Sequence, residues 1–111
     1  MDNEHLIHGL IIDHLKRRFR REYSEIKVNA AGDPDLTLSN HGLVLAVVEV
    51  ETESSITPEK AGKWKDLAQP GTKLILMVPK SARVKVMEIL WQKGIADRVG
   101  VGTYDIAITM P

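Results

Sequence analysis

The stretch Leu43 to Val50 constrains the fold of this chain more than any other feature of its sequence. It is almost wholly apolar and rich in valine, and it is interrupted only by Glu49. A continuous apolar run of this length is typical of a strand that is buried on both of its faces. We therefore expect a sheet with helices on both sides, and not a sheet that exposes one face to water.

Helical and strand patterns alternate along the rest of the chain in an order that fits such a sheet. Residues 5–22 and the segments that follow Thr57 and Ser81 place apolar side chains at helical spacing, and Pro70-Gly71 and Gly94 stop the second and third helices. The stripes predicted to face the core are Leu6, Ile7, Leu10, Ile11, Leu15 and Phe19, then Ala61, Trp64, Leu67 and Ala68, then Val84, Met87, Leu90 and Trp91. The predicted strands are residues 24–30, 35–39, 43–50, 74–78 and 99–108. The resulting order, α-β-β-β-α-β-α-β, predicts an α/β fold with a mixed central sheet flanked by helices.

Size, charge and cysteine content exclude several classes of protein. A chain of 111 residues and 12.4 kDa is expected to form a single domain, residues 1–111. Fifteen basic and fifteen acidic side chains balance, so any affinity for nucleic acid has to come from a local cluster. The absence of cysteine excludes disulfides, thiolate nucleophiles and cysteine-based zinc sites. An acidic, polar start and no apolar run of membrane-spanning length predict a cytoplasmic protein without a membrane partner.

Three carboxylates are predicted to meet at one end of the sheet. Glu49 and Glu51 are two residues apart on a strand and therefore project from the same face. Asp35 begins the preceding strand, and the turn Asn40-His41-Gly42 makes the two strands antiparallel. Counting outward from residue 41 places Asp35 opposite Val47, within one register step of Glu49. Carboxylates at such close range repel one another, and a divalent cation with oxygen ligands is the physical remedy.

These residues resemble the PD-(D/E)XK nuclease superfamily, which has the restriction-endonuclease-like fold. The similarity lies in Gly32-Asp33-Pro34-Asp35-Leu36, in a strand that ends Val48-Glu49-Val50-Glu51, and in the helix that follows, and it covers roughly residues 5–80. The resemblance implies that Asp35, Glu49 and the backbone carbonyl of Val50 hold Mg²⁺ or Mn²⁺. It further implies hydrolysis of phosphodiester bonds in nucleic acid, in the first instance DNA.

The chain departs from this superfamily at Glu51, where the usual motif has lysine. Some members carry glutamate there, so Glu51 is a candidate metal ligand or a group that orients the attacking water. In other branches the lysine lies on the following helix, where Lys60 and Lys63 are the candidates to stabilise the attacked phosphate. Many members also place a carboxylate on the first helix. Candidates for that position are Glu4 and Asp13, and His8 could take a similar place.

A basic run at the end of the first helix is the candidate surface for the nucleic-acid backbone. It consists of Lys16, Arg17, Arg18, Arg20 and Arg21. Contacts between such side chains and phosphates would be sensitive to salt. A chain this small has no separate recognition domain, and by analogy with superfamily members of this size we expect that a homodimer can form.

Each functional interpretation has a structural alternative. Asp35 could cap a turn, Glu49 and Glu51 could be the solvated end of a strand, and the basic run could be a solvated helix end. Trp64 is expected in the core, and the histidines on the surface. The alternative function is a catalytically inactive domain of the same fold that acts as a binding or assembly module, with the missing motif lysine as its mark. A third possibility is a small α/β domain of unrelated fold, in which Asp35 and Glu49 would lie far apart.

Overall fold

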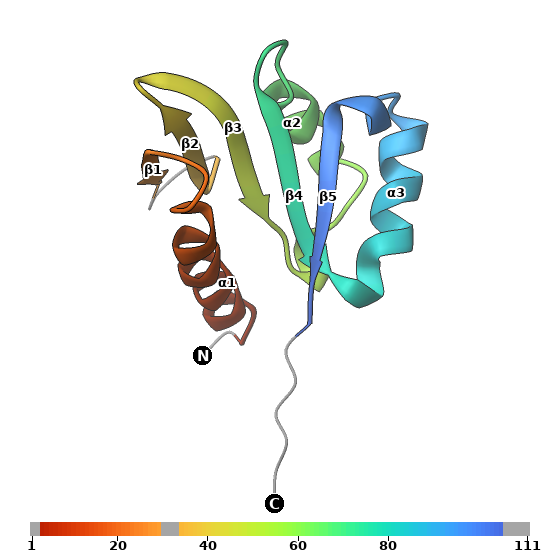
Figure 1. The fold of residues 1–111 in the computed structure, drawn as a ribbon. Coiled ribbons are helices and arrows are strands. Elements are labelled where there is room, and N and C mark those ends of the chain that lie inside the picture. The colour runs from red at the N-terminus through yellow and green to blue at the C-terminus, as the bar shows by residue number, and fades with distance from the viewer. Residues whose placement is uncertain (1–2, 30–33, 106–111) are drawn as a thin grey trace, which may run out of the picture.

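The computed structural model describes residues 3–29 and 34–105, and it has five strands and three α-helices in the predicted order. Figure 1 shows the strands side by side in one twisted sheet. The helices and strands are α1 (Asn3–Phe19), β1 (Glu25–Val28), β2 (Leu36–Asn40), β3 (Leu43–Val50), α2 (Lys60–Leu67), β4 (Lys73–Pro79), α3 (Arg83–Gln92) and β5 (Val99–Tyr104). Short 3₁₀ turns lie at Glu53–Ser55, Lys80–Ala82 and Ala96–Arg98.

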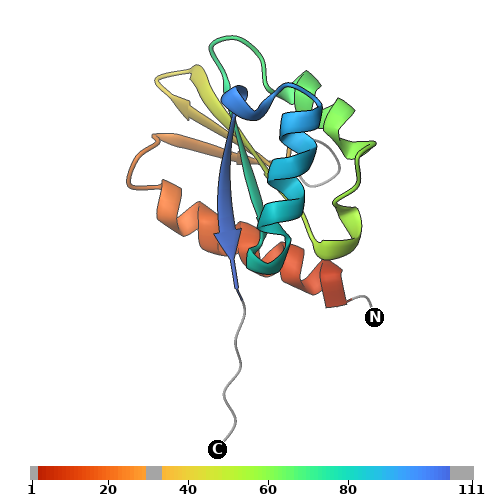
Figure 2. The same cartoon turned by 90° about the vertical axis from the view of Figure 1, so that its right-hand side faces the viewer.

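The sheet is mixed, and its spatial order is the same as its order in the sequence. β1, β2 and β3 form an antiparallel meander, whereas β3, β4 and β5 are parallel and are joined through α2 and α3. Parallel neighbours need a crossover connection, and each of the two crossovers here is a helix. Figure 2 shows α2 and α3 next to each other in front, with α1 crossing behind.

The helices bury both faces of β3 from Ala46 to Val50, whereas Leu43 and Val44, at the start of the run predicted to be buried, are 64% and 39% exposed. On the α1 face, Leu15 packs with Leu36, Leu38, Ala46, Val48 and Val50. On the opposite face, the core contains Val47, Ile56, Trp64, Leu74, Leu76, Val78, Val86, Ile89 and Leu90. Residues Ala46 to Val50 are all buried, so β3 is the central element of the domain. In the described part of the chain, no helix has both the length and the apolar character needed to cross a membrane.

Two of the predicted apolar stripes face partly in the wrong direction. Leu6 and Leu10 of α1 are 49% and 60% exposed, and Val84 and Trp91 of α3 are 70% and 73% exposed. On α3 the buried side chains are instead Val86, Ile89 and Leu90. Both helices carry apolar residues on more than one side, so helical periodicity alone does not decide which side meets the sheet.

The element boundaries differ from the predicted ones by a few residues. α1 covers residues 3–19, not 5–22, and β1 is confined to residues 25–28. The helix predicted to begin after Thr57 begins at Lys60, and the backbone N–H of Lys60 donates to the Thr57 hydroxyl at 3.3 Å. Ala30, the turn at residues 31–33 with Asp33, and the end of the last predicted strand (residues 106–108) lie outside the described residues.

The register of the β2–β3 hairpin differs from the predicted one and brings Asp35 closer to Glu49. His41 and Gly42 have φ angles of 52° and 82° and form a two-residue turn within the predicted Asn40-His41-Gly42 segment, because Asn40 still belongs to β2 and pairs with Leu43. A bulge between Leu38 and Ser39 then shifts the pairing, and Leu36 lies opposite Val48. The next pair along is Asp35 with Glu49. The predicted partner of Asp35, Val47, pairs instead with Thr37.

Candidate functional site

A cavity of about 370 Å³ lies where the chain leaves β3, and it collects most of the predicted site residues. The start of α1, the end of β3 and the start of α2 surround it. It is lined by Glu4, His5, His8, Asp35, Glu49, Val50, Glu51, Thr52, Ser54, Ser55, Lys60 and Lys63. Figure 2 shows the segment after β3 beside the N-terminal end of α1, and the Ser54 backbone N–H donates to Glu4 Oε1 at 3.0 Å.

Asp35 and Glu49 are buried and are held side by side by two hydrogen bonds, one between Asp35 and Glu49 and one between Val50 and Asp35. The Asp35 backbone N–H donates to Glu49 Oε1 at 2.9 Å, and the Val50 backbone N–H donates to Asp35 Oδ2 at 2.8 Å. Glu49 is 2% exposed and Asp35 is 9% exposed. The unrelated-fold alternative requires these residues to lie far apart, and the described structure places them side by side.

Each of the two carboxylates also meets a nitrogen from a helix. Lys63 Nζ on α2 lies 3.1 Å from Glu49 Oε2, and His8 Nε2 on α1 lies 3.2 Å from Asp35 Oδ2. Lys63 is one of the two predicted candidates for the displaced motif lysine, and it is the lysine that reaches Glu49. His8 is the predicted alternative to an acidic side chain on the first helix. Both helices therefore contribute a side chain to the Asp35–Glu49 pair.

Glu51 has a separate set of partners inside the same cavity wall. Its Oε2 accepts a hydrogen bond from Trp64 Nε1 at 3.0 Å. Its Oε1 accepts one from the Ser55 hydroxyl at 3.2 Å and lies 3.5 Å from Lys60 Nζ. The Glu51 side chain is thus anchored to the core tryptophan and holds Lys60 at the mouth of the cavity.

Simple periodicities explain why two lysines meet two glutamates. Glu49 and Glu51 are two apart on a strand, and Lys60 and Lys63 are three apart on a helix, so each pair lies on one face of its element. Trp64 is adjacent to Lys63 and is fully buried, which fixes the rotation of α2 against the sheet. The anchored helix then directs its lysines toward the end of β3.

Of the residues on α1 that are predicted as site candidates, some line the cavity and one lies elsewhere. Glu4 lines the cavity, and its carboxylate accepts hydrogen bonds from the backbone N–H and the hydroxyl of Ser54. These bonds lower the pKa of Glu4 from its usual value. Asp13 instead lines a different hollow with Lys16, Arg17 and Arg20. The structure therefore brings Glu4 and His8 to the site and leaves Asp13 outside it.

The two carboxylates and one backbone oxygen form a donor set that suits a hard divalent cation. The N–H of Glu51 bonds to Met77 on the β4 side, and the N–H of Val50 bonds to Asp35 on the β2 side. The N–H and C=O of one strand residue point to the same edge, so the Val50 carbonyl faces β2. Pro34, opposite Val50 in the continued register, has no N–H to donate to that carbonyl.

Magnesium in proteins is usually held by one or two carboxylates, with waters and substrate oxygens completing its coordination. Among the described residues, no three acidic or histidine side chains form a ready-made group for an ion. The groups with oxygens suited to hold a divalent cation are therefore Asp35, Glu49 and the Val50 carbonyl. Glu51, a further predicted ligand, has its oxygens directed at Trp64, Ser55 and Lys60, just as those of Glu49 are directed at the Asp35 N–H and at Lys63.

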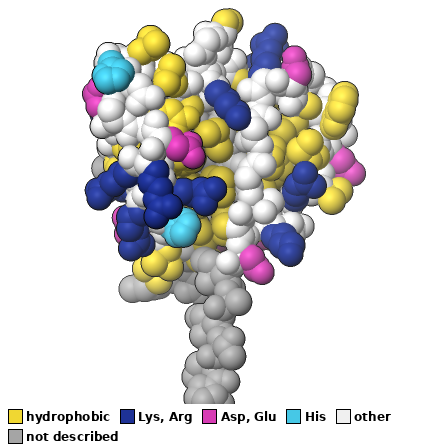
Figure 3. Space-filling view, viewed as in Figure 1, with side chains coloured by type: hydrophobic (Ala, Val, Ile, Leu, Met, Phe, Trp, Pro, Cys, Tyr) yellow, Lys and Arg dark blue, Asp and Glu magenta, His cyan; other side chains and the backbone are white. Residues whose placement is uncertain are grey.

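The basic run is remote from this cavity within one chain. His8 lines the cavity and Arg18 lies ten residues further along the chain, which is about 15 Å along a helix axis. Figure 3 shows lysine and arginine side chains gathered over α1 on the left of the molecule. Arg17 and Arg20 line a shallow hollow with Lys16, and Arg18 lines another beside β5. The five predicted nucleic-acid contacts therefore do not converge on the carboxylates.

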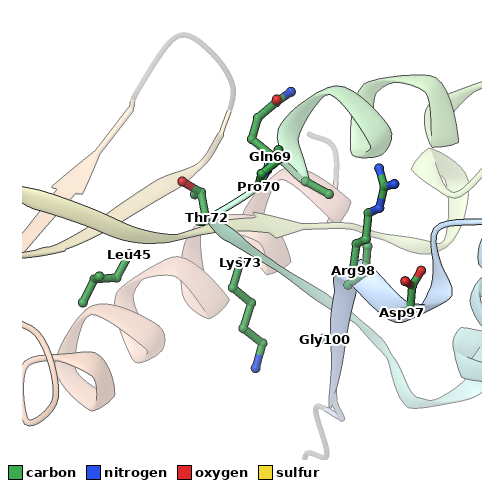
Figure 4. A pocket seen from close by; sticks show the side chains of 11 residues that line it. Leu45, Gln69, Pro70, Thr72, Lys73, Asp97, Arg98 and Gly100 are labelled. Atoms are coloured by element: carbon green, nitrogen blue, oxygen red, sulfur yellow. The ribbon is translucent and has the colours of Figure 1, made fainter.

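A larger hollow of about 740 Å³ lies at the other end of the sheet. Figure 4 shows that its walls come from the turns before β4 and β5, with Lys73 and Arg98 directed apart. Asp97 is the acidic residue among those that line it. Its size exceeds that of the carboxylate cavity, but its side chains do not converge on a common point. Chemistry, and not volume, identifies the cavity at the end of β3 as the candidate site.

Tyr104 supports the site from β5, a role that the sequence does not predict. Its hydroxyl donates to the Glu51 backbone carbonyl at 2.6 Å. Burial, followed by the nearby charges of Glu4, Glu53 and Glu51, raises the pKa of Tyr104 to about 12. A tyrosine in a late, glycine-containing strand has no sequence signal that connects it to the end of β3.

Replacing Tyr104 by Phe is expected to flatten the alkaline dependence of stability. The folded state holds the Tyr104 proton up to about pH 12, whereas the unfolded state releases it near the ordinary pKa of 10.0. The stabilisation is therefore complete below pH 10 and declines as the pH rises toward 12. Denaturant unfolding between about pH 9 and pH 11 should show a steeper loss in wild type than in Tyr104→Phe. Parallel curves would contradict this account of Tyr104.

Comparison with known proteins does not add a family to this description. No protein-family description, curated protein or solved structure matches the chain.

Proposed function

We propose that this domain is a metal-dependent nuclease of the PD-(D/E)XK type, with Asp35 and Glu49 as its metal-holding carboxylates. The observation that carries the proposal is the hydrogen-bonded Asp35–Glu49 pair, with Lys63 Nζ 3.1 Å from Glu49. The order of elements and the mixed sheet agree with the fold that the resemblance implies.

The acidic and lysine side chains at the end of β3 and the start of α2 have separate roles in this proposal. Asp35, Glu49 and the Val50 carbonyl would hold Mg²⁺ or Mn²⁺. Such an ion lowers the pKa of a bound water and neutralises charge on an attacked phosphate. Lys63 would stabilise negative charge that develops on the phosphate oxygens during attack. Glu51 is a positioning residue, because its contact with Lys60 places a second ammonium group at the cavity mouth.

A second candidate is the catalytically inactive binding or assembly module. It is favoured by one observation: Glu49 and Glu51 each already have a lysine partner within 3.5 Å. A network of this kind compensates the buried charges without an ion. The two functions differ in whether the carboxylates bind a divalent cation and whether phosphodiester bonds are cut.

Cleavage of labelled single-stranded DNA, double-stranded DNA and RNA with Mg²⁺ or Mn²⁺ tests the proposal. Glu49→Gln should abolish cleavage, because it removes a metal-holding charge. Lys63→Met should reduce kcat by about 10²- to 10³-fold, the usual effect of removing one group that stabilises transition-state charge. Lys85→Met is the matched control, since Lys85 is an exposed lysine of α3 remote from the cavity.

The pattern of losses distinguishes the two candidate functions. Metal-dependent cleavage that survives in Lys85→Met and disappears in Glu49→Gln would support the nuclease. Cleavage that persists at the wild-type rate in Glu49→Gln would come from a contaminant and would contradict the proposal. The absence of cleavage on all three substrates, together with the absence of ion binding, would favour the inactive module.

A further inference from the structure

The outer surface of α3 exposes large apolar side chains to water. Trp91 is 73% exposed and Val84 is 70% exposed, although helical periodicity assigns both to the core. Trp91 lies seven residues after Val84 and four after Met87, so the three side chains share one side of the helix. Figure 2 shows this helix on the outside of the molecule, in front of the sheet. The core therefore makes little use of the indole ring of Trp91.

Cations accompany these apolar side chains toward the end at which α3 begins. Arg83 lies four residues before Met87, so it continues the line that Met87 and Trp91 form along the helix. Lys80 is exposed in the short turn that leads into α3. We call Arg83, Val84, Met87 and Trp91 the α3 ridge, which is about 12 Å long because a helix rises 1.5 Å per residue. The α3 ridge thus has a basic end and an aromatic end.

The basic end of the α3 ridge lies beside the candidate site. Lys80 lines a hollow of about 260 Å³ together with Glu4 and Thr52, and both of these residues also line the carboxylate cavity. At the same junction the Ser81 hydroxyl donates to the carboxylate of Glu53. The α3 ridge therefore begins next to the carboxylate cavity and leads away from it along the helix.

We propose that the α3 ridge binds a single-stranded segment of nucleic acid, with one unpaired base stacked on Trp91 and the adjacent phosphates held by Arg83 and Lys80. An exposed indole offers a flat face to a base of any sequence, and cations beside it match a phosphate backbone. In a duplex the faces of a base are covered by its neighbours, so this arrangement selects single strands.

The size of the apolar surface favours a nucleic acid over a protein as its occupant. A stable protein interface takes about 20–30 residues from each partner. The α3 ridge has three apolar side chains on one helix of ten residues, and Met87 is partly buried against the core. One stacked base needs no more than a single exposed ring, and the neighbouring cations give the ridge the charge that complements phosphates.

This inference rests on the proposed nuclease function and names the class of its substrate. The metal and the cavity lysines act on a phosphodiester bond whatever the state of the neighbouring bases. A base stacked on Trp91 has to be unpaired, so the strand that reaches the cavity from the α3 ridge is single-stranded there. The expected substrate is therefore DNA or RNA with an unpaired segment beside the cleaved bond.

Binding of a fluorescent oligothymidylate of about ten nucleotides, followed by anisotropy in EDTA, tests the α3 ridge without metal or cleavage. Trp91→Leu keeps an apolar side chain and removes the stacking face, so it should weaken binding about 5- to 150-fold. Trp91→Phe keeps a smaller aromatic face and should lose less. Leu43→Ala alters an apolar residue of β3 that is 64% exposed, and this control should bind like wild type.

The fluorescence of the protein gives an independent measure of stacking. The chain has two tryptophans, of which Trp64 is fully buried and Trp91 is exposed. Oligothymidylate should therefore quench part of the emission of wild type and leave that of Trp91→Phe unchanged. Quenching of equal size in both proteins would contradict a base stacked on Trp91.

A pair of charge substitutions tests the path of the phosphates. Arg83→Met should weaken binding and reduce the slope of log K against log salt by about 0.7, the value for one contact with a single strand. Lys85→Met is the matched control, because Lys85 lies six residues before Trp91 and projects about 120° away from it around the helix. Equal effects of the two substitutions would contradict the assigned path.

A DNA duplex of the same length separates the outcomes. It should bind wild type and Trp91→Leu equally, because its paired bases offer no face to the indole. Equal binding of oligothymidylate by wild type and Trp91→Leu, or an equal loss on both substrates, would overturn the proposal. Failure of wild type to bind oligothymidylate would also overturn it and would point to a protein occupant. Binding that depends on Trp91 without any cleavage would uphold the α3 ridge and contradict the nuclease, whereas cleavage with no effect of Trp91→Leu would do the reverse.

Discussion

Mn²⁺ at saturating concentration is expected to raise the thermal unfolding midpoint of the wild-type protein by on the order of 10 °C or more. A ligand that binds only the folded state, at about 100 times its dissociation constant, stabilises that state by about 2.7 kcal/mol. In a domain of this size, each kcal/mol shifts the midpoint by about 4–8 °C. The effect should be large because the ion would join two buried carboxylates that the chain holds side by side.

Two substitutions test where the ion binds. Glu49→Gln should eliminate the metal-dependent shift, while the Gln side-chain oxygen still accepts the hydrogen bond from the Asp35 backbone. Glu88→Gln, on the exposed surface of α3, serves as the control and should keep the full shift. An equal shift in wild type and Glu49→Gln would show that any bound ion lies elsewhere on the protein.

Replacing Trp64 by Ala is expected to cause a severe loss of stability. Trp64 is fully buried in the core beneath α2, and its ring also carries the N–H that holds Glu51. Truncation of a buried tryptophan typically costs about 3–5 kcal/mol. At about 4–8 °C per kcal/mol, the midpoint should fall by on the order of 20 °C. Thermal and denaturant unfolding both measure this loss, and a fall of only a few degrees would contradict the central place of Trp64 in the core.

A double-mutant cycle separates the packing role of Trp64 from its hydrogen bond to Glu51. Trp64→Phe keeps an aromatic ring and removes the N–H, which leaves one oxygen of a buried carboxylate without that donor. Loss of a hydrogen bond to a charged group costs about 1.5–3 kcal/mol. In a Glu51→Leu background, Trp64→Phe should cost clearly less, because the carboxylate is absent. The same cost in both backgrounds would show that the bond contributes nothing to folding.

Local sequence signals predict the order of elements and the turn of the hairpin well. Asn40-His41-Gly42 allows the positive φ angles that the structure has at His41 and Gly42. The apolar run from Leu43 to Val50 predicts the central strand because only a strand covered on both sides has so little need of polar side chains. These features depend on neighbouring residues, so the sequence alone is sufficient for them.

Features that depend on contacts between distant elements are predicted less well. The bulge at Leu38 and Ser39 has no sequence signature, and together with the two-residue turn it places Asp35 opposite Glu49, whereas counting outward from residue 41 places it opposite Val47. The orientations of α1 and α3 depend on which of several apolar sides meets the sheet. Helical periodicity therefore assigns Leu10 and Trp91 to the core, whereas the structure exposes them.

The candidate site also combines features that local sequence spacing predicts with features that depend on contacts between distant elements. The convergence of Asp35, Glu49 and Glu51 follows from strand periodicity and one hairpin, and all three line the cavity. The choice between Lys60 and Lys63 depends on the rotation of α2, which the burial of Trp64 determines. The contact of His8 with Asp35 depends on how α1 crosses the sheet, so sequence spacing can only nominate His8 as a candidate.

Electron paramagnetic resonance of Mn²⁺ tests the central claim most directly, because free aqueous Mn²⁺ gives a sharp signal that is lost when the ion binds. Titration of the protein into Mn²⁺ should remove one equivalent of this signal per chain in wild type and almost none in Asp35→Asn or Glu49→Gln. That result would establish Asp35 and Glu49 as the residues that hold the ion. An undiminished signal with wild type, or equal binding by all three proteins, would contradict the metal site on which the proposed function rests.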